Sequence, residues 1–114
     1  MEPNRKYKII YTESAILDIE EKADYIEYKF RDSALAQTWY LRLRDTIQEE
    51  LSTFPLMNGL YNQSPWDEKG VRLMLFRNDV ILYSVDMDSK TVYIRAVCTK
   101  GRDLAAHLDQ EQRK

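Results

Sequence analysis

The sequence predicts an α+β fold, a two-layer sandwich in which an antiparallel αα-hairpin packs on a mainly antiparallel sheet in the order β-α-α-β-β-β. Three observations predict it: residues 7–11 are β-branched and aromatic, two long amphipathic stretches follow, and three short apolar stretches separated by turn residues come last. With 114 residues, of which 44% are hydrophobic, residues 1–114 are expected to form a single domain.

The two amphipathic stretches carry apolar side chains at spacings of three and four, the period of a helix that buries one face. Thr12 or Ser14 is expected to cap the first helix, and Asp32 or Ser33 the second. The first apolar stripe consists of Ile16, Ile19, Ala23, Ile26 and Phe30. The second consists of Ala36, Trp39 or Tyr40, Leu43, Ile47, Leu51 and Phe54, and Pro55 follows it. The short connection between the stripes predicts a helical hairpin whose apolar face needs the sheet to cover it.

The remaining strands are expected near residues 71–76, 80–85 and 91–98, after a loop at 55–70 that is rich in Gly, Pro, Asn and Ser. Side chains alternate between the two faces of a strand. We therefore expect one face to pack on the helices, with Val71, Leu73, Leu75, Val92, Ile94 and Ala96. The opposite face would carry Arg72, Met74, Phe76, Tyr93, Arg95 and Val97.

Charge is distributed unevenly along a chain whose net charge is only −2. Residues 13–30 contain six acidic residues and two lysines, whereas residues 69–102 contain seven basic residues and three aspartates. An acidic helix beside a basic sheet favours an anionic partner at the sheet, because local potential steers a ligand more than net charge does.

The predicted arginine-and-aromatic face admits three interpretations. Guanidinium groups bind phosphate and aromatic rings stack on unpaired bases, which favours nucleic acid. An ordinary solvated sheet face and a groove covered by another protein fit the same residues. The turn at residues 99–103 adds two cations around a glycine. Together the candidate anion- or partner-binding residues are Arg72, Met74, Phe76, Arg77, Tyr93, Arg95, Lys100 and Arg102.

Several classes of site are not expected. The sequence has no Walker, Rossmann, CxxC, HExxH or GxSxG motif and only three glycines, so neither a cofactor nor a metal site is predicted. The single Cys98 suits a reducing cytoplasm and is expected to be a buried, inert thiol. No apolar run approaches the roughly 20 residues of a membrane span. His107, the only histidine, could act as a general base, although surface placement is the simpler interpretation.

Several short motifs, in this order, resemble the RelE/ParE superfamily of bacterial toxins. They are residues 11–15, 24–26, 43–47 with Phe54 and Pro55, 70–72, 81–85 and 95–103. The resemblance implies the toxin half of a type II toxin–antitoxin pair, neutralised by a cognate antitoxin that wraps around it. The outer groove of the hairpin, with Leu17, Tyr25, Tyr28 and Tyr40, and the arginine face are the surfaces expected to bind that antitoxin.

The departures from the superfamily pattern favour its ParE-like branch, whose members inhibit DNA gyrase by binding. RelE-like members instead cut ribosome-bound mRNA with basic residues on the sheet and a tyrosine or histidine near the C-terminus. Arg72 and Arg102 lie near such positions, and His107 or Tyr93 would have to transfer the proton, because Leu108 stands where a catalytic tyrosine would lie. The middle strand lacks the expected arginine, and the hairpin is long. A third possibility is a non-toxic member that acts as an interaction module.

Overall fold

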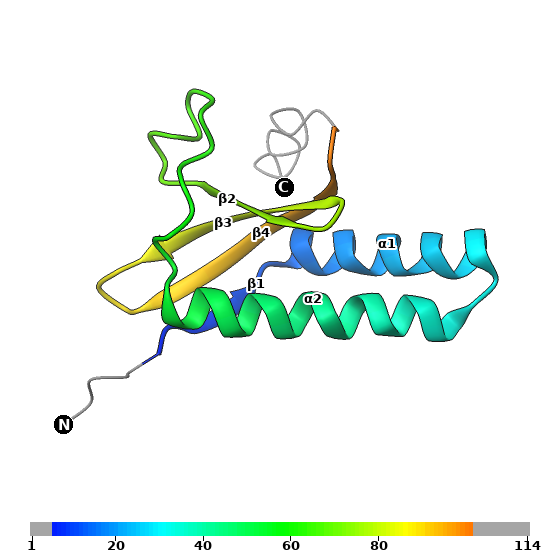
Figure 1. The fold of residues 1–114 in the computed structure, drawn as a ribbon. Helices are drawn as coiled ribbons and strands as arrows, with labels where there is room; N and C mark the ends of the chain where they lie inside the picture. The colour runs from blue at the N-terminus through cyan, green and yellow to red at the C-terminus, as the bar shows by residue number, and fades with distance from the viewer. Residues whose placement is uncertain (1–5, 102–114) are drawn as a thin grey trace.

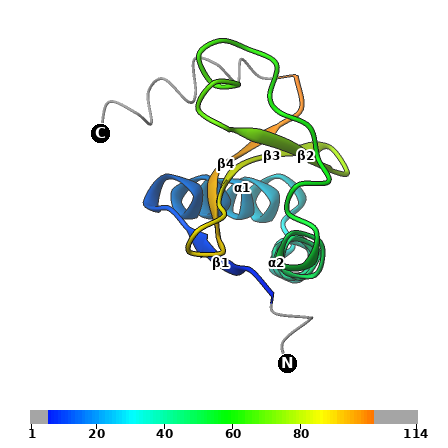
Figure 2. The ribbon, with the colours of Figure 1, turned by 90° about the vertical axis from the view of Figure 1, so that its left-hand side faces the viewer.

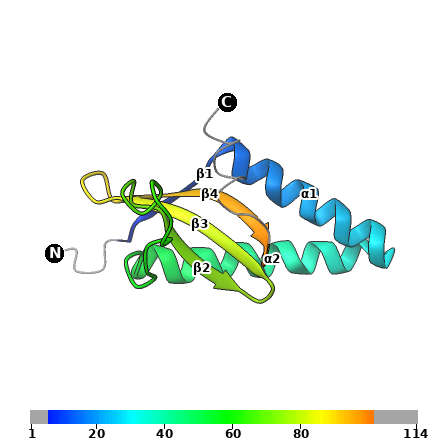
Figure 3. The same ribbon diagram turned by 90° about the horizontal axis from the view of Figure 1, so that it is seen from above.

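The computed structural model describes residues 6–101 and confirms the predicted α+β architecture (Figure 1). Its elements are β1 (Lys8–Tyr11), α1 (Glu13–Phe30), α2 (Ser33–Thr53), β2 (Arg72–Phe76), β3 (Asp79–Asp86) and β4 (Thr91–Thr99). The two helices form an antiparallel hairpin on one face of a four-stranded sheet. The end of the hairpin that carries the α1–α2 turn extends beyond the strands (Figures 1 and 3).

The strands lie in the order β1-β4-β3-β2 (Figure 3). β2, β3 and β4 are joined by tight hairpins and pair antiparallel. β1 pairs parallel to β4, with Lys8 opposite Thr91, because the helical hairpin carries the chain back before the other strands form. The sheet is therefore mixed, with one parallel pair.

Each helix begins after one of the two residues predicted to cap it, Thr12 for α1 and Asp32 for α2. Thr12 Oγ1 accepts a hydrogen bond from the N–H of Ala15 at 3.2 Å, and Asp32 Oδ1 accepts one from the N–H of Leu35 at 3.1 Å. Each cap satisfies a backbone donor that has no partner within its helix. Between the helices Arg31 adopts a left-handed conformation, with φ 52°, which allows the chain to reverse in two residues.

The main core lies between the helices and the sheet. Ala15 and Ile19 of α1 and Leu43, Ile47 and Leu51 of α2 are buried in it. They contact sheet residues that are also buried, namely Met74, Phe76, Ile81, Tyr83, Val92, Ile94 and Val97. Ile16 and Phe30 of the predicted first stripe are instead 44% and 56% exposed, because the stripe turns away from the sheet and the hairpin extends past it.

The expected assignment of β2 side chains to the two faces is wrong. Met74 and Phe76 face the helices and are buried, whereas Val71 and Leu73 face away from them and Leu75 is 56% exposed. The loop between α2 and β2 accounts for the difference, since it packs over the far face of the sheet (Figure 2). Because apolar side chains occupy both faces of β2, and the loop covers the far face at Val71 and Leu73, the alternation does not reveal which face meets the helices.

A bulge in β4 changes its alternation as well. Tyr83 pairs with Ile94 and Leu82 pairs with Ala96, so Arg95 has no partner on β3. The extra residue turns Ala96 to the far face and Val97 to the helices, opposite to the expected faces, and Cys98 lies on the far face with Ala96. On the far face a second core forms around Trp66 of the loop, with Val71, Val80, Leu82, Ala96 and Cys98.

Candidate functional site

The basic residues predicted to share one face are separated by the structure. Arg72 lies at the start of β2, where Nη1 donates hydrogen bonds to the carbonyl oxygens of Asn58 at 2.5 Å and Leu56 at 3.4 Å. Tyr83 completes the same contact region: its hydroxyl donates to the Pro55 carbonyl and accepts from the Asn58 amide. Arg72 therefore fastens the start of the loop to the sheet.

Arg77 and Lys100 lie at the end of the sheet that faces the hairpin overhang. Arg77, in the β2–β3 turn with φ 56°, places its guanidinium over the ring of Phe76, 5.5 Å from the centroid. The N–H of Lys100 donates to the carbonyl of Asn78 in the same turn. Arg102, His107 and Leu108 lie outside the described residues, so the arrangement of the predicted catalytic residues stays a prediction.

Tyr93 and Arg95 do lie together, on the far face of the sheet. The Arg95 guanidinium is 5.6 Å from the centroid of the Tyr93 ring, and its Nε donates to Ser84 Oγ at 2.9 Å. Both residues are partly exposed. Of the six predicted far-face residues, this pair keeps the expected position, whereas Met74, Phe76 and Val97 face the helices.

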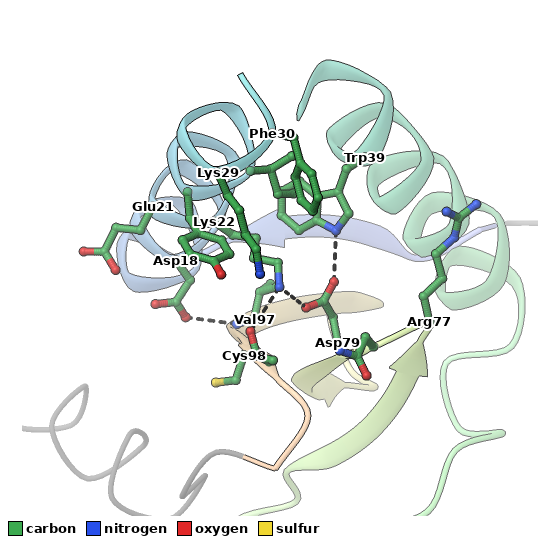
Figure 4. Close-up of a pocket in the computed structure, with 14 residues that line it drawn as sticks. Asp18, Glu21, Lys22, Lys29, Phe30, Trp39, Arg77, Asp79, Val97 and Cys98 are labelled. Atoms are coloured by element: carbon green, nitrogen blue, oxygen red, sulfur yellow. Dashed lines mark hydrogen bonds and ion pairs between the residues drawn. The ribbon is translucent and has the colours of Figure 1, made fainter. Parts of the chain in front are cut away.

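The largest concavity that we describe is a groove of about 580 Å³ under the overhanging hairpin (Figure 4). One wall is α1 and the opposite wall is the β2–β3 turn, and Trp39 of α2 closes one end. Its apolar lining includes Tyr25, Ile26, Phe30, Trp39 and Val97, and its charged lining includes Glu21, Lys29 and Arg77. We call it the overhang groove.

A buried carboxylate organises the floor of the overhang groove. Asp79, whose side chain is 4% exposed, forms an ion pair with Lys22 Nζ at 3.0 Å and accepts a hydrogen bond from Trp39 Nε1 at 2.9 Å. Lys22 also donates to Thr99 Oγ1 at 3.0 Å, and Asp18 accepts from the N–H of Val97. These contacts connect both helices to β3 and to the end of β4 (Figure 4).

This group was not predicted from the sequence. Asp18 and Lys22 belong to the stretch 13–30 that was noted only for its acidic charge, and Asp79 lies between two of the expected strands. An aspartate in a tight hairpin is common in any turn, so the spacing contained no signal that it would meet a tryptophan 40 residues earlier in the chain. The second apolar stripe was expected to contain either Trp39 or Tyr40, and it is Trp39 that lies toward the sheet.

Two tyrosines have pKa values that disfavour a role as a base near neutral pH. Burial, together with the nearby Tyr40, raises the pKa of Tyr11 to about 12 against the opposing effect of Arg44. Burial also raises the pKa of Tyr83, despite the hydrogen bond from Asn58 and the charge of Arg72. Both hydroxyls stay protonated at neutral pH, and that of Tyr83 acts as a structural donor.

Exposed aromatic side chains gather on the C-terminal half of α1. Tyr25 is 52% exposed, Tyr28 83% and Phe30 56%, and the Lys29 ammonium lies 5.6 to 5.7 Å from the ring centroids of Tyr25 and Phe30. Leu17 and Tyr40, predicted to join them, are 49% and 37% exposed. We call Tyr25, Tyr28, Lys29 and Phe30 the hairpin patch.

Within residues 6–101 no three His, Cys, Asp or Glu side chains lie close enough to hold a metal ion. In the same part of the chain neither helix is long and apolar enough to cross a membrane. The concavities found among these residues are open surface features lined by both charged and apolar groups, which suit a polypeptide or an anion.

Comparison with solved structures identifies the fold. A chain of the chromosomal ParDE toxin–antitoxin system from P. aeruginosa superposes with a TM-score of 0.66 at 16% identity, over 82% of this chain and 96% of that one. A chain of the RelBE2 toxin–antitoxin complex from Mycobacterium tuberculosis gives 0.54 at 18% identity, over 85% and 94%. A mutant of the E. coli toxin RelE in the free state gives 0.54 at 15% identity, over 93% of each chain.

No protein-family model and no curated protein sequence matches the chain. The solved structures nevertheless show the fold: the chain has the fold of chains in the ParDE and RelBE2 toxin–antitoxin structures and of the toxin RelE. This confirms the fold that the sequence motifs implied. Of the three structures described here, the ParDE structure has the highest TM-score.

Proposed function

We propose that this protein is the toxin of a type II toxin–antitoxin pair, that a cognate antitoxin neutralises it, and that it inhibits DNA gyrase by binding, as a ParE-like toxin. The observation that carries the proposal is the fold likeness, with a TM-score of 0.66 to the ParDE structure against 0.54 to the RelBE2 and RelE structures. The likeness concerns the fold, and the activity is the inference drawn from it.

The positions of the basic residues support binding over RNA cleavage. The guanidinium of Arg72 is occupied by two backbone carbonyls, and Arg95 lies on a different part of the sheet with its Nε bound to Ser84. In the middle of β3 the side chains of Val80, Ile81, Leu82 and Tyr83 are buried. Cleavage next to a 2′-hydroxyl needs a base and cations converging on one phosphate. Within residues 6–101, Arg72 does not line the hollow that Tyr93, the other described residue named for this role, shares with Arg95.

Growth inhibition and gyrase inhibition can be tested together. Induction of the protein without an antitoxin is expected to arrest growth, and the purified protein is expected to block supercoiling of relaxed plasmid by gyrase and to increase cleaved DNA. A matched control is the same assay with topoisomerase I, which should be unaffected. Arrested cells whose gyrase still supercoils DNA at the same toxin concentration would contradict the gyrase proposal.

The alternative is a RelE-like ribosome-dependent endoribonuclease, which the likeness to RelBE2 and RelE favours. It would use Arg102 and His107, with Arg72 or Tyr93 assisting. In that case induction should produce messenger RNA cut within translated codons, and His107→Ala should abolish the cuts. Intact message in arrested cells would exclude this alternative and leave the gyrase proposal standing.

The overhang groove and the hairpin patch are the surfaces we assign to the antitoxin. They are adjacent, since Tyr25, Lys29 and Phe30 belong to both, and together they leave large apolar side chains in water. A flexible antitoxin segment that ordered along them would bury this area at the cost of its own conformational entropy. The charges of Lys29 and Arg77 would favour an acidic segment at that position.

A further inference from the structure

We propose a second binding site, for a phosphate group, on the far face of the sheet. The site is a hollow of about 500 Å³ between the loop before β2 and the β3–β4 hairpin. Lys69, Ser84, Tyr93 and Arg95 contribute to its lining. It lies on the sheet face opposite the helices, and it does not depend on the identity of the toxin's target.

The first argument is the position of Arg95. It is the unpaired residue of the β4 bulge, and a bulge redirects a side chain that regular pairing would hold elsewhere. The hydrogen bond from Nε to Ser84 Oγ at 2.9 Å and the contact with the Tyr93 ring fix the guanidinium from two sides. Both Nη groups are left to donate to a ligand, which is the arrangement that suits an oxyanion.

The second argument is that a second cation is held at the same hollow. The Lys69 ammonium lies 5.0 Å from the centroid of the Trp66 ring, in a turn closed by hydrogen bonds from its own N–H to Pro65 and Trp66. Neither Lys69 nor Arg95 forms an ion pair with a carboxylate of residues 6–101. Because neither cation is ion-paired, both can attract an anion, against the opposing charges of Asp86 and Asp88 in the same hollow.

The chemistry of the donors favours phosphate over carboxylate. Lys69, Ser84 and Arg95 come from three different segments, and each offers a donor: an ammonium, a hydroxyl and a guanidinium. A phosphate presents three acceptor oxygens, whereas a carboxylate presents two. Tyr93 adds an apolar edge beside the site, which a nucleotide's sugar or base can contact.

Two carboxylates that also line the hollow limit the affinity for an anion. Asp86 Oδ1 accepts hydrogen bonds from the N–H groups of Asp88 and Ser89 and so serves the β3–β4 turn. Asp88 is exposed, also lines the hollow, and would repel an anion. Replacing this residue with a neutral isostere should therefore strengthen binding at the site, which provides a test that does not depend on loss of structure.

The test is titration of the full chain with inorganic phosphate, a nucleoside monophosphate and a short single-stranded oligonucleotide, followed by calorimetry and by NMR shifts at Ser84 and Arg95. Arg95→Gln should weaken binding about tenfold, the loss of one charge-assisted contact, and Asp88→Asn should tighten it about twofold at low salt. Arg42→Gln, which removes an equal charge from an exposed position of α2, should change nothing.

The ligands distinguish the source of the phosphate. Equal affinity for the monophosphate and the oligonucleotide indicates a single phosphate as the recognised unit, whereas tighter binding of the oligonucleotide that is lost in Arg95→Gln indicates a phosphodiester backbone. Thermal unfolding of each variant checks that the fold is intact. Absence of binding by all three ligands, or equal losses in Arg95→Gln and Arg42→Gln, would overturn the proposal, and neither result bears on gyrase inhibition.

Discussion

Asp79 shows how one side chain can hold both helices against the sheet. Its carboxylate is almost completely buried, and removal from water is costly for a charge unless partners compensate. Lys22 supplies the opposite charge and Trp39 a hydrogen bond, one from each helix. The overhang groove therefore has a floor that is fixed before any partner binds.

Replacing Asp79 with asparagine should lower the free energy of unfolding by about 2 kcal/mol, because the amide can still accept from Trp39 but leaves the Lys22 ammonium without its counter-charge. Urea unfolding of Asp79→Asn, Lys22→Met and the double variant measures this. The double variant should be less destabilised than the sum of the single variants. Strict additivity would show that the two side chains do not interact energetically.

Tyr11 should make stability depend on pH in the alkaline range. Its pKa is about 12 in the folded protein and about 10 in an unfolded chain, so the folded protein holds the phenolic proton more tightly. The resulting stabilisation is fully present below pH 10 and is lost as the pH rises from 10 to 12. Two pKa units correspond to about 2.7 kcal/mol, and solvent screening of this partly exposed side chain reduces the expected loss to about 2 kcal/mol. Unfolding of the wild type and Tyr11→Phe across this range should show a shallower decline in the variant, and parallel curves would refute the assignment.

At the scale of elements, the connection between the helices stores strain that can be relieved. Arg31 has φ 52° and ψ 44°, a region that side chains with a Cβ atom disfavour and glycine adopts readily. Arg31→Gly should therefore raise the free energy of unfolding by about 0.5 kcal/mol. Arg42→Gly, in the interior of α2, should lower it by about 1 kcal/mol. A loss of stability in both variants would mean that the Arg31 side chain makes a stabilising contact.

The elements themselves were predictable, but not the faces of two strands. Helix caps at Thr12 and Asp32 and all strand positions follow from local chemistry, which acts over a few residues. The face of β2 depended on a loop whose Trp66 packs on the far side of the sheet, and the face of β4 depended on a bulge at Arg95. Neither the packing of a loop nor an inserted residue leaves a periodic signal in the sequence.

The candidate sites were predictable to a smaller extent. Tyr93 and Arg95 lie together as expected, because neighbouring positions of one strand are close in any fold. The overhang groove could not be foreseen, since it requires α1, α2 and the β2–β3 turn to meet across long separations in sequence. Arg72 was expected to face a partner, but its guanidinium binds carbonyls of a loop whose path the sequence does not specify.

At the scale of the whole molecule, the charges around the overhang groove should govern antitoxin binding. Lys29→Glu and Arg77→Glu are expected to weaken the complex more at low than at high salt, because screening already reduces the attraction at high salt. Arg42→Glu makes the same change of charge outside the groove and serves as the control. Calorimetry at two salt concentrations measures the effect, and equal affinities for all four proteins at low salt would place the antitoxin elsewhere.

The parallel pair of β1 and β4 has a consequence for the timing of synthesis. Thr12, at the end of β1, donates to the carbonyl of Ile94, 82 residues later in the chain. At about 5 to 20 residues per second, a ribosome needs roughly 4 to 16 s to supply that partner. In the later part of this interval, after α2 has emerged, the nascent chain has its helical hairpin but no sheet to cover it, so a chaperone would find its apolar stripe accessible until β4 emerges.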